Sequence, residues 1–219
     1  MSLASILEVV LPPSCAGCGA FGEVLCRHCV TSMRAADDPQ AAFLATNAST
    51  LVAAESVELM VAALRHEGAT RRALQRLKYG GAARLAAPLA RAALPALDRL
   101  LAISGPVTLV PVPVHPIRAR ERGYNQALLL ATCIAEARDL PMRDVLRRPR
   151  ATVRQHGLDR AARLANLRDA FAPRPVAMPR RVILVDDILT TGATFEACAA
   201  VLRHAGSTSV YGLAIAREV

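Results

Sequence analysis

The stretch VILVDDILTTGAT, residues 182–194, constrains the fold more than any other part of the chain. Four consecutive apolar residues predict a strand buried on both faces, as in a parallel sheet, and Asp186 and Asp187 follow at its carboxyl end. A loop rich in Thr and Gly then leads into a predicted helix. Ligands of parallel α/β sheets gather at the carboxyl ends of strands. The acidic pair is therefore the first candidate for a functional site.

The rest of the chain alternates between strand and helix patterns. We predict helices at 69–80, 84–102 with an interruption or kink at Pro88 and Pro95, 125–140 and 194–206. Compact apolar runs predict strands at 59–66, 107–114, 181–187 and 209–216. Such alternation is typical of an α/β fold in which helices flank a parallel sheet.

The loop after the acidic pair favours an anion. Backbone N–H groups at the start of the predicted helix, together with the Thr hydroxyls, form a typical phosphate site. Two carboxylates beside that site would repel a ligand that carried only negative charge. They suit a ligand that also presents hydroxyl groups or a metal ion, and a sugar phosphate meets both demands.

The amino-terminal segment carries a C-x2-C-x7-C-x2-C pattern made of Cys15, Cys18, Cys26 and Cys29. Four thiolates at paired spacing suit a closed tetrahedral zinc site. Two disulfides or a redox pair are the alternatives, and a reducing compartment disfavours the disulfides. His28 could replace one ligand, although with four cysteines it is expected to be an exposed neighbour.

Length and composition limit the remaining choices. The chain has 219 residues, 53% of them hydrophobic, and a net charge of +9, which indicates a globular basic protein. No run of about 18 apolar residues predicts a membrane span, and the opening segment is a poor signal peptide. We therefore expect a cytoplasmic protein with a zinc module at 1–45 and a larger domain at 46–219.

The stretch at 182–194 resembles the signature of type I phosphoribosyltransferases, which bind phosphoribosyl pyrophosphate (PRPP). The resemblance implies that Asp186 and Asp187 take the ribose hydroxyls. It also implies that the 5′-phosphate lies in the loop formed by Thr190, Thr191, Gly192, Ala193 and Thr194. Ala193 stands where many members have a second glycine, a departure that matters only if the backbone there needs a positive φ.

Nearly the whole chain resembles the ComF (competence protein F, or GntX-like) family. The resemblance rests on the four cysteines, on LKYGG at 77–81 and on LVPVPVHPIRARERGYNQA at 109–127. It rests further on RQHGLDRAARLANLRDAF at 154–171 and on the PRPP signature. It implies a type I phosphoribosyltransferase-like fold behind a zinc module, with a role in DNA uptake during natural transformation. A helicase and single-stranded DNA are the partners that it implies.

Basic residues outside the signature suggest further roles. The stretch after the predicted strand at 107–114 stands where this fold would place a pyrophosphate loop, and its Arg118, Arg120 and Arg122 offer guanidinium forks to a pyrophosphate. His115 in that stretch is expected to be a hydrogen-bonding loop residue, with a catalytic base as the alternative. Residues 143–168 contain eight arginines, which fit a mobile lid, a surface that tracks nucleic acid or a solvated helix face. The candidates in that segment are Arg147, Arg148, Arg150, Arg154 and Arg163. Lys78 is the single lysine and lies either near bound phosphates or at the surface by accident.

Two functions remain open at this stage. A phosphoribosyltransferase would transfer the sugar to a nitrogen acceptor, with Mg²⁺ on the leaving pyrophosphate and Asp186, Asp187 and Arg118 as catalytic candidates. A PRPP-binding protein of DNA uptake would reuse the same fold without turnover. The aromatic content of 3% disfavours a base-stacking platform for DNA, and the acidic pair would repel a DNA backbone. We favour retained PRPP binding.

Overall fold

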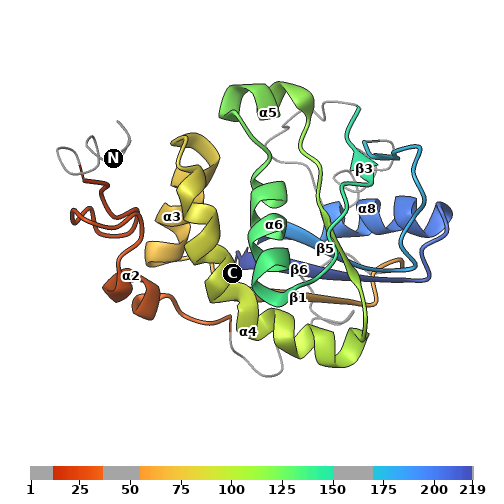
Figure 1. The fold of residues 1–219 in the computed structure, drawn as a ribbon, viewed down its shortest axis with the longest axis horizontal. Helices are drawn as coiled ribbons and strands as arrows, with labels where there is room; N and C mark the ends of the chain where they lie inside the picture. Colours follow the sequence, from red (N-terminus) through yellow and green to blue (C-terminus); the bar gives the residue numbers. More distant parts are fainter. Residues whose placement is uncertain (1–11, 37–54, 150–169, 219) are drawn as a thin grey trace.

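The computed structural model describes residues 12–36, 55–149 and 170–218 (Figure 1). Its strands are β1 Leu59–Arg65, β2 Thr108–Pro111, β3 Leu146–Arg147, β4 Ala172–Pro173, β5 Arg181–Leu189 and β6 Ser209–Arg217. Its helices are α2 Arg27–Ser32, α3 Gly68–Tyr79, α4 Ala86–Ser104, α5 Pro116–Arg122, α6 Gln126–Arg138 and α8 Ala193–His204, with a short 3-10 turn at Ala83–Leu85.

A four-stranded parallel sheet in the order β1-β6-β5-β2 forms the centre of the molecule. β5, the strand of the acidic pair, lies inside the sheet between β6 and β2. β3 and β4 form a separate antiparallel pair. The expected α/β fold, with a parallel sheet flanked by helices and preceded by a four-cysteine segment, is confirmed.

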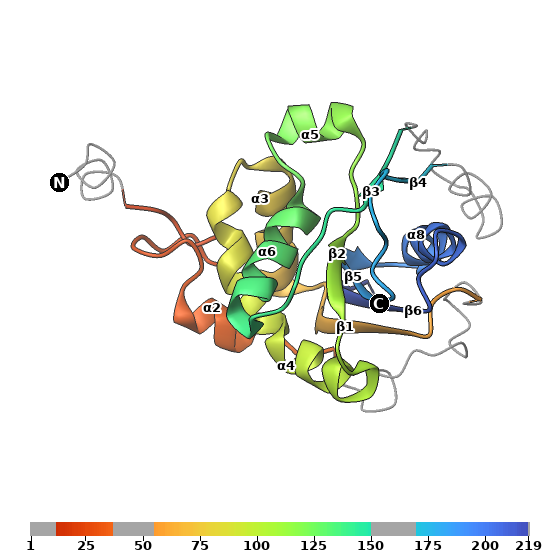
Figure 2. The same cartoon turned by 45° about the vertical axis from the view of Figure 1, so that its right-hand side comes forward.

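Helices cover both faces of the sheet, as Figure 2 shows: α3, α4 and α6 lie on one side and α8 on the other. Successive residues of β5 divide between these layers because side chains alternate along a strand. Ile183 and Val185 pack in the cluster that includes α4 and α6, whereas Val182 and Leu184 pack in the cluster of α8. This burial on both faces explains why the strand reads as an unbroken apolar run.

Several element boundaries differ from the sequence prediction. α4 runs unbroken through Pro95, and Pro88 lies in its first turn, where no intrahelical N–H bond is lost. β5 extends two residues beyond Asp187, whereas β2 ends early, at Pro111. α5 forms where a loop was expected. Pro116 at its start and the left-handed Gly123 at its end are ordinary helix-boundary residues.

Neighbouring segments cover both edges of the sheet. At β1, Ala35 forms an antiparallel bridge with Leu64, and the N–H of Ala36 donates to Ala63 O at 3.0 Å. At β2, the N–H of Leu109 donates to Pro141 O at 2.8 Å. The backbone groups at the two outer strands are therefore partly paired.

The cysteine segment packs directly against α3. Cys15 and Cys29 belong to the same apolar cluster as Leu74 and Leu77 of that helix. The predicted domain boundary near residue 45 lies outside the described residues, so the division into 1–45 and 46–219 stays a prediction. Across the described residues, no helix combines the length and the apolar character that a membrane crossing needs.

Candidate functional site

The acidic pair lies where β5 loses one of its two neighbours. The pairing of β2 with β5 ends at Pro111 and Val185, and only the N–H of Val112 still bonds to Val185 O, at 2.9 Å. β6 continues to pair with β5 as far as Leu189. Residues 112–115, which follow β2, line a cavity beside the acidic pair.

A cavity of about 310 Å³ opens beside the acidic pair. Charged groups dominate its lining: the cations are those of Lys78, Arg118, Arg122 and Arg148, and the carboxylates are those of Asp186, Asp187 and Glu218. His66, His115, Gln126, Thr190 and Thr194 add polar groups. A cavity that mixes both charge signs with hydroxyl groups suits a ligand that carries phosphates and hydroxyls together.

The two aspartates differ in their surroundings. Asp187 pairs with Lys78, with Nζ 2.8 Å from Oδ2, and its side chain is only 5% exposed. Asp186 Oδ1 accepts the backbone N–H of Asp187 at 2.8 Å. Burial, followed by the neighbouring charge of Asp187, raises the pKa of Asp186 to about 8. Asp186 therefore holds a proton near neutral pH in the absence of a ligand.

The loop after β5 places two of its predicted phosphate-binding residues, Thr190 and Thr194, at the cavity. Thr191 instead supports the loop, since its Oγ1 accepts the N–H of Ala193 at 3.5 Å. Gly192 has φ +79°, and a Cβ there would lie 3.1 Å from the end of the Met60 side chain, so both the backbone and the packing favour glycine. Ala193 begins α8 without a positive φ. The departure from a second glycine is therefore harmless.

Helix α5 carries the three arginines predicted to bind pyrophosphate. Arg118 and Arg122 line the cavity, and Arg122 is held by Gln126 Oε1 at 2.8 Å. Arg120 is exposed and lies outside the cavity lining. His115 caps the helix, because its Nδ1 accepts the N–H of Ile117 at 3.3 Å. This bond agrees with its expected role as a hydrogen-bonding loop residue.

Only part of the arginine-rich segment lies within the described residues. Arg148 lines the cavity, and its guanidinium stacks 5.0 Å from the centre of the Phe171 ring. Arg147 is exposed on β3. Arg148 thus shares one cavity with Asp186. Arg150, Arg154 and Arg163 lie outside the described residues.

Two titratable residues of the cavity, His66 and Glu218, were not singled out in the sequence. His66 follows β1 and Glu218 follows β6, so both stand at carboxyl ends of strands. His66 Nε2 is buried without a hydrogen-bond partner, and burial lowers the pKa of this imidazole. Asp186 was found by the rule that ligands gather at the carboxyl ends of strands, and this rule applies to every strand of a parallel sheet. Applied to β1 and β6, the rule would have found both residues.

The four cysteines of the amino-terminal segment converge on one point. Their sulfur atoms all lie within 4.8 Å of one another, and Cys18 Sγ lies 3.7 Å from Cys26 Sγ. Sulfur atoms about 2.3 Å from a tetrahedral zinc ion would be about 3.8 Å apart. The cluster could therefore hold a metal such as zinc. His28 is exposed and outside the cluster, as expected.

The backbone around the cluster also suits bound thiolates. Cys15 Sγ accepts the N–H groups of Gly17 and Cys26, each at 3.3 Å. Burial raises the pKa of Cys15, but these and other N–H groups outweigh burial and lower the pKa to about 6. Burial, together with the other cysteines, raises the pKa of Cys29 to about 12. A metal ion would supply the charge needed to ionise all four thiols.

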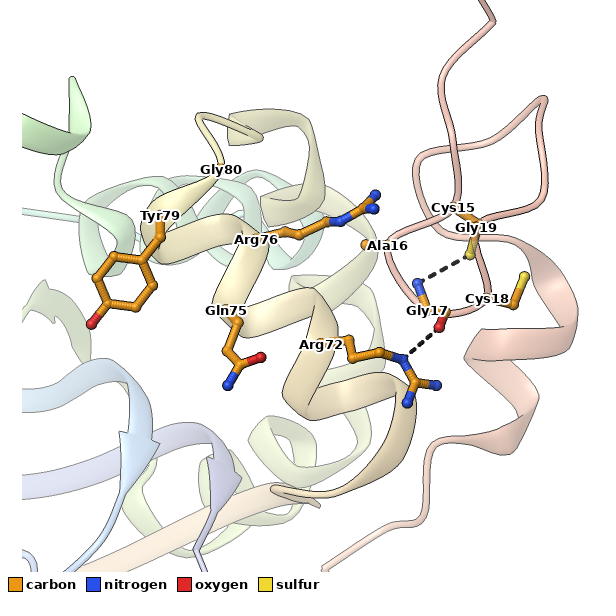
Figure 3. A pocket seen from close by; sticks show the side chains of 10 residues that line it. All are labelled: Cys15, Ala16, Gly17, Cys18, Gly19, Arg72, Gln75, Arg76, Tyr79 and Gly80. Atoms are coloured by element: carbon orange, nitrogen blue, oxygen red, sulfur yellow. Dashed lines mark hydrogen bonds between the residues drawn. The ribbon is translucent and has the colours of Figure 1, made fainter.

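A larger hollow, of about 670 Å³, is lined by residues of the cysteine loop and of α3 (Figure 3). Arg72 and Arg76 point from the helix toward the loop, and Arg72 Nε donates to Gly17 O at 2.5 Å. Among residues 12–36, 55–149 and 170–218, no acidic side chain lines this hollow. It therefore lacks the hydroxyl-accepting carboxylates that distinguish the cavity at β5.

Comparison with known proteins identifies similar proteins that are named either as competence proteins or as a DNA utilization protein. The chain is 39% identical to "Competence protein F" of Haemophilus influenzae over 115 residues, which are 50% of each chain. It is 32% identical to "DNA utilization protein YhgH" of Escherichia coli K12 over 143 residues, or 63% of this chain and 62% of the relative. "Competence protein ComFC" of Streptococcus pneumoniae is 31% identical over 108 residues, 49% of this chain and 47% of the relative. The resemblance deduced from the motifs is confirmed.

These matches span between about half and under two thirds of the length of the curated relatives. No protein-family model matches the chain. Among solved structures, the glutamine PRPP amidotransferase of Bacillus subtilis is similar to 60% of this chain and 26% of that protein, with 21% identity and a TM-score of 0.37. The orotate phosphoribosyltransferase of Mycobacterium tuberculosis is similar to 80% of this chain, with a TM-score of 0.31.

Proposed function

We propose that the cavity at the carboxyl end of β5 binds PRPP or a closely related phosphoribosyl ligand. One observation carries the proposal: a single cavity joins the acidic pair, the Thr residues that precede and begin α8, and several cationic side chains. The carboxylates suit the ribose hydroxyls, and Thr190 and Thr194 suit the 5′-phosphate. Arg118 and Arg122 suit the pyrophosphate.

The biological setting that we propose is the handling of incoming DNA. The names of the relatives, competence proteins and a DNA utilization protein, support that setting. In this proposal single-stranded DNA and a helicase of DNA uptake are partners, and PRPP is a bound ligand. A competing proposal, favoured by the charged cavity, is a phosphoribosyltransferase that transfers the sugar to a nitrogen acceptor.

Two metal ions belong to the proposal. Zinc would have a structural role at the four cysteines, where it leaves no open coordination position. Within the described residues, the cysteine cluster is the one group of three or more Cys, His, Asp or Glu side chains close enough to hold a metal. Mg²⁺ would therefore arrive with the pyrophosphate of PRPP, which it commonly accompanies in such chemistry.

Asp186→Asn is the sharpest test of PRPP binding. It removes a carboxylate from the cavity but leaves the ion pair between Lys78 and Asp187 in place. The asparagine oxygen can still accept the N–H that Asp186 accepts in the wild type. We expect the fold to be retained and the affinity for Mg-PRPP, measured by titration calorimetry, to fall about tenfold or more, because a charged hydrogen bond contributes about 1.5–3 kcal/mol.

Arg91→Gln is a suitable control, because Arg91 is exposed on α4 and absent from the cavity lining. It should bind Mg-PRPP as the wild type does. Equal affinities for the wild type and Asp186→Asn would refute the ribose assignment.

Release of pyrophosphate from PRPP in the presence of ammonia or a nucleobase would favour the transferase, whereas binding without release would favour the ligand-binding role.

A further inference from the structure

The single lysine of the chain, Lys78, lies in a largely buried position. Lys78 lies in the last turn of α3, and its ammonium group is 2.8 Å from Asp187 Oδ2. Its side chain is 19% exposed and that of Asp187 is 5% exposed. Desolvation of such a pair is costly unless both charges are well matched. This placement is difficult to explain as an accident of the surface.

The geometry points to Lys78 as a positioning residue for the acidic pair: it balances the charge of Asp187, so that Asp186 and Asp187 can both be ionised when a ligand presents two hydroxyl groups. The inference deepens the proposed function, on which its ligand depends. It also assigns to the LKYGG stretch a role that the sequence left open.

The balance of charge around the pair supports this role. Two adjacent carboxylates oppose each other's ionisation, and a cation within about 4–6 Å offsets that opposition. Burial and the charge of Asp187 raise the pKa of Asp186, whereas Lys78 acts in the opposite direction. The other titratable or charged side chains of the cavity are those of His66, His115, Arg118, Arg122, Arg148 and Glu218.

Helix α3 fixes the ammonium group. Ala73, Leu74 and Leu77 are fully buried, so the helix cannot rotate without opening the core. A cation in the last turn also interacts favourably with the helix dipole. Lys78 and Arg122 also line an adjoining hollow of about 320 Å³. The ammonium group thus stands between the acidic pair and the arginines of α5.

Carboxyl-carbon NMR titration of the ligand-free protein tests the inference without PRPP. The variants are Lys78→Met, Lys78→Gln as a smaller perturbation of folding, and Lys78→Arg, which restores the charge. In the Met and Gln variants the pKa of Asp186 should rise by about one unit or more, because the lowering effect of Lys78 is lost. Lys78→Arg should stay closer to the wild type, and Arg91→Gln should match it.

Binding of Mg-PRPP between pH 6 and 9 supplies the second measurement. Hydroxyl binding by the carboxylate of Asp186 strengthens as the pH rises through the pKa of that side chain. The Met and Gln variants should therefore gain affinity at higher pH than the wild type and bind about tenfold more weakly at pH 7.5. A purely structural role of Lys78 would lower the affinity without displacing this pH profile.

The two proposals fail in different ways. Carboxyl titrations of Lys78→Met and Lys78→Gln that overlay the wild-type curve would overturn the inference, whatever PRPP does. A wild type that shows the expected titrations but does not bind Mg-PRPP would refute the proposed ligand and leave the role of Lys78 supported. Reduced affinity with an unshifted pH profile would also count against the positioning role.

Discussion

Replacing Gly17 with alanine should disrupt the cysteine cluster through one steric contact. A Cβ at residue 17 would lie 2.4 Å from Cys29 Sγ and 2.8 Å from Cys29 Cβ. Non-bonded heavy atoms prefer separations of about 3.5–4.0 Å, so the sulfur and the backbone of residue 17 must separate by roughly 1.1–1.6 Å. Metal–ligand distances tolerate only about 0.2 Å. Cys29 would therefore be a poor fourth ligand.

The size of the effect follows from the cost of overpacking. Forcing an extra methyl group into a well-packed site costs about 1–3 kcal/mol. At about 1.4 kcal/mol for each factor of ten, zinc affinity should fall about 5- to 150-fold. Competition with a chromophoric chelator measures this change directly. Because the cluster packs with Leu74 and Leu77 of α3, the melting temperature should also fall.

Gly19→Ala is the matched control. Gly19 has φ +83°, but a Cβ there would have no atom within 4 Å. This variant should lose about 1–2 kcal/mol of stability through backbone strain, yet it should keep zinc affinity near the wild-type value. If Gly17→Ala bound zinc as tightly as Gly19→Ala, steric access to Cys29 would not be the reason for glycine at residue 17.

Two further predictions concern stability. Glu196 Oε1 accepts the N–H of Ser56 at 2.8 Å, and its Oε2 accepts the N–H of Val57 at 3.3 Å. Because Glu196→Gln places an amide donor against one of these N–H groups, the free energy of unfolding in urea should fall by about 1.5–3 kcal/mol. An unchanged urea midpoint would contradict this prediction. The pKa of Asp186 is raised from the ordinary value of 3.8 to about 8 in the folded protein, so between these two pH values the folded state binds more protons than the unfolded chain. Ligand-free stability should therefore decline as the pH rises toward 8, and thermal melts of Asp186→Asn should lack that decline.

The elements could be predicted from the sequence wherever local patterning and burial agree. The run at 182–185 is apolar because both of its faces are buried, so its assignment as a strand was secure. α5 was missed because the expected pyrophosphate loop outweighed the helix-start signal of Pro116. The early end of β2 could not be foreseen, because VPVPV is as apolar after Pro111 as before it.

The candidate site was harder to predict because strands distant in sequence build it. The acidic pair and its loop form one contiguous motif, and so their approximate place was predictable. Lys78 and Asp187 are far apart in the sequence, and no local pattern indicates their contact. Likewise, Glu218 approaches the cavity because β6 lies next to β5, an order that the sequence of either strand does not specify.

The backbone bonds that link residues 34–36 to β1 bear on association between molecules. An outer strand with free N–H and C=O groups is a template on which another chain can add a strand. Residues 34–36, which follow the cysteine segment, pair with β1 at Ala63 and Leu64. The residues after α6 pair with β2, the other outer strand, at Leu109. A shortened chain that began after residue 36 would uncover the apolar strand β1. We therefore expect such a shortened chain to aggregate more readily than the full chain.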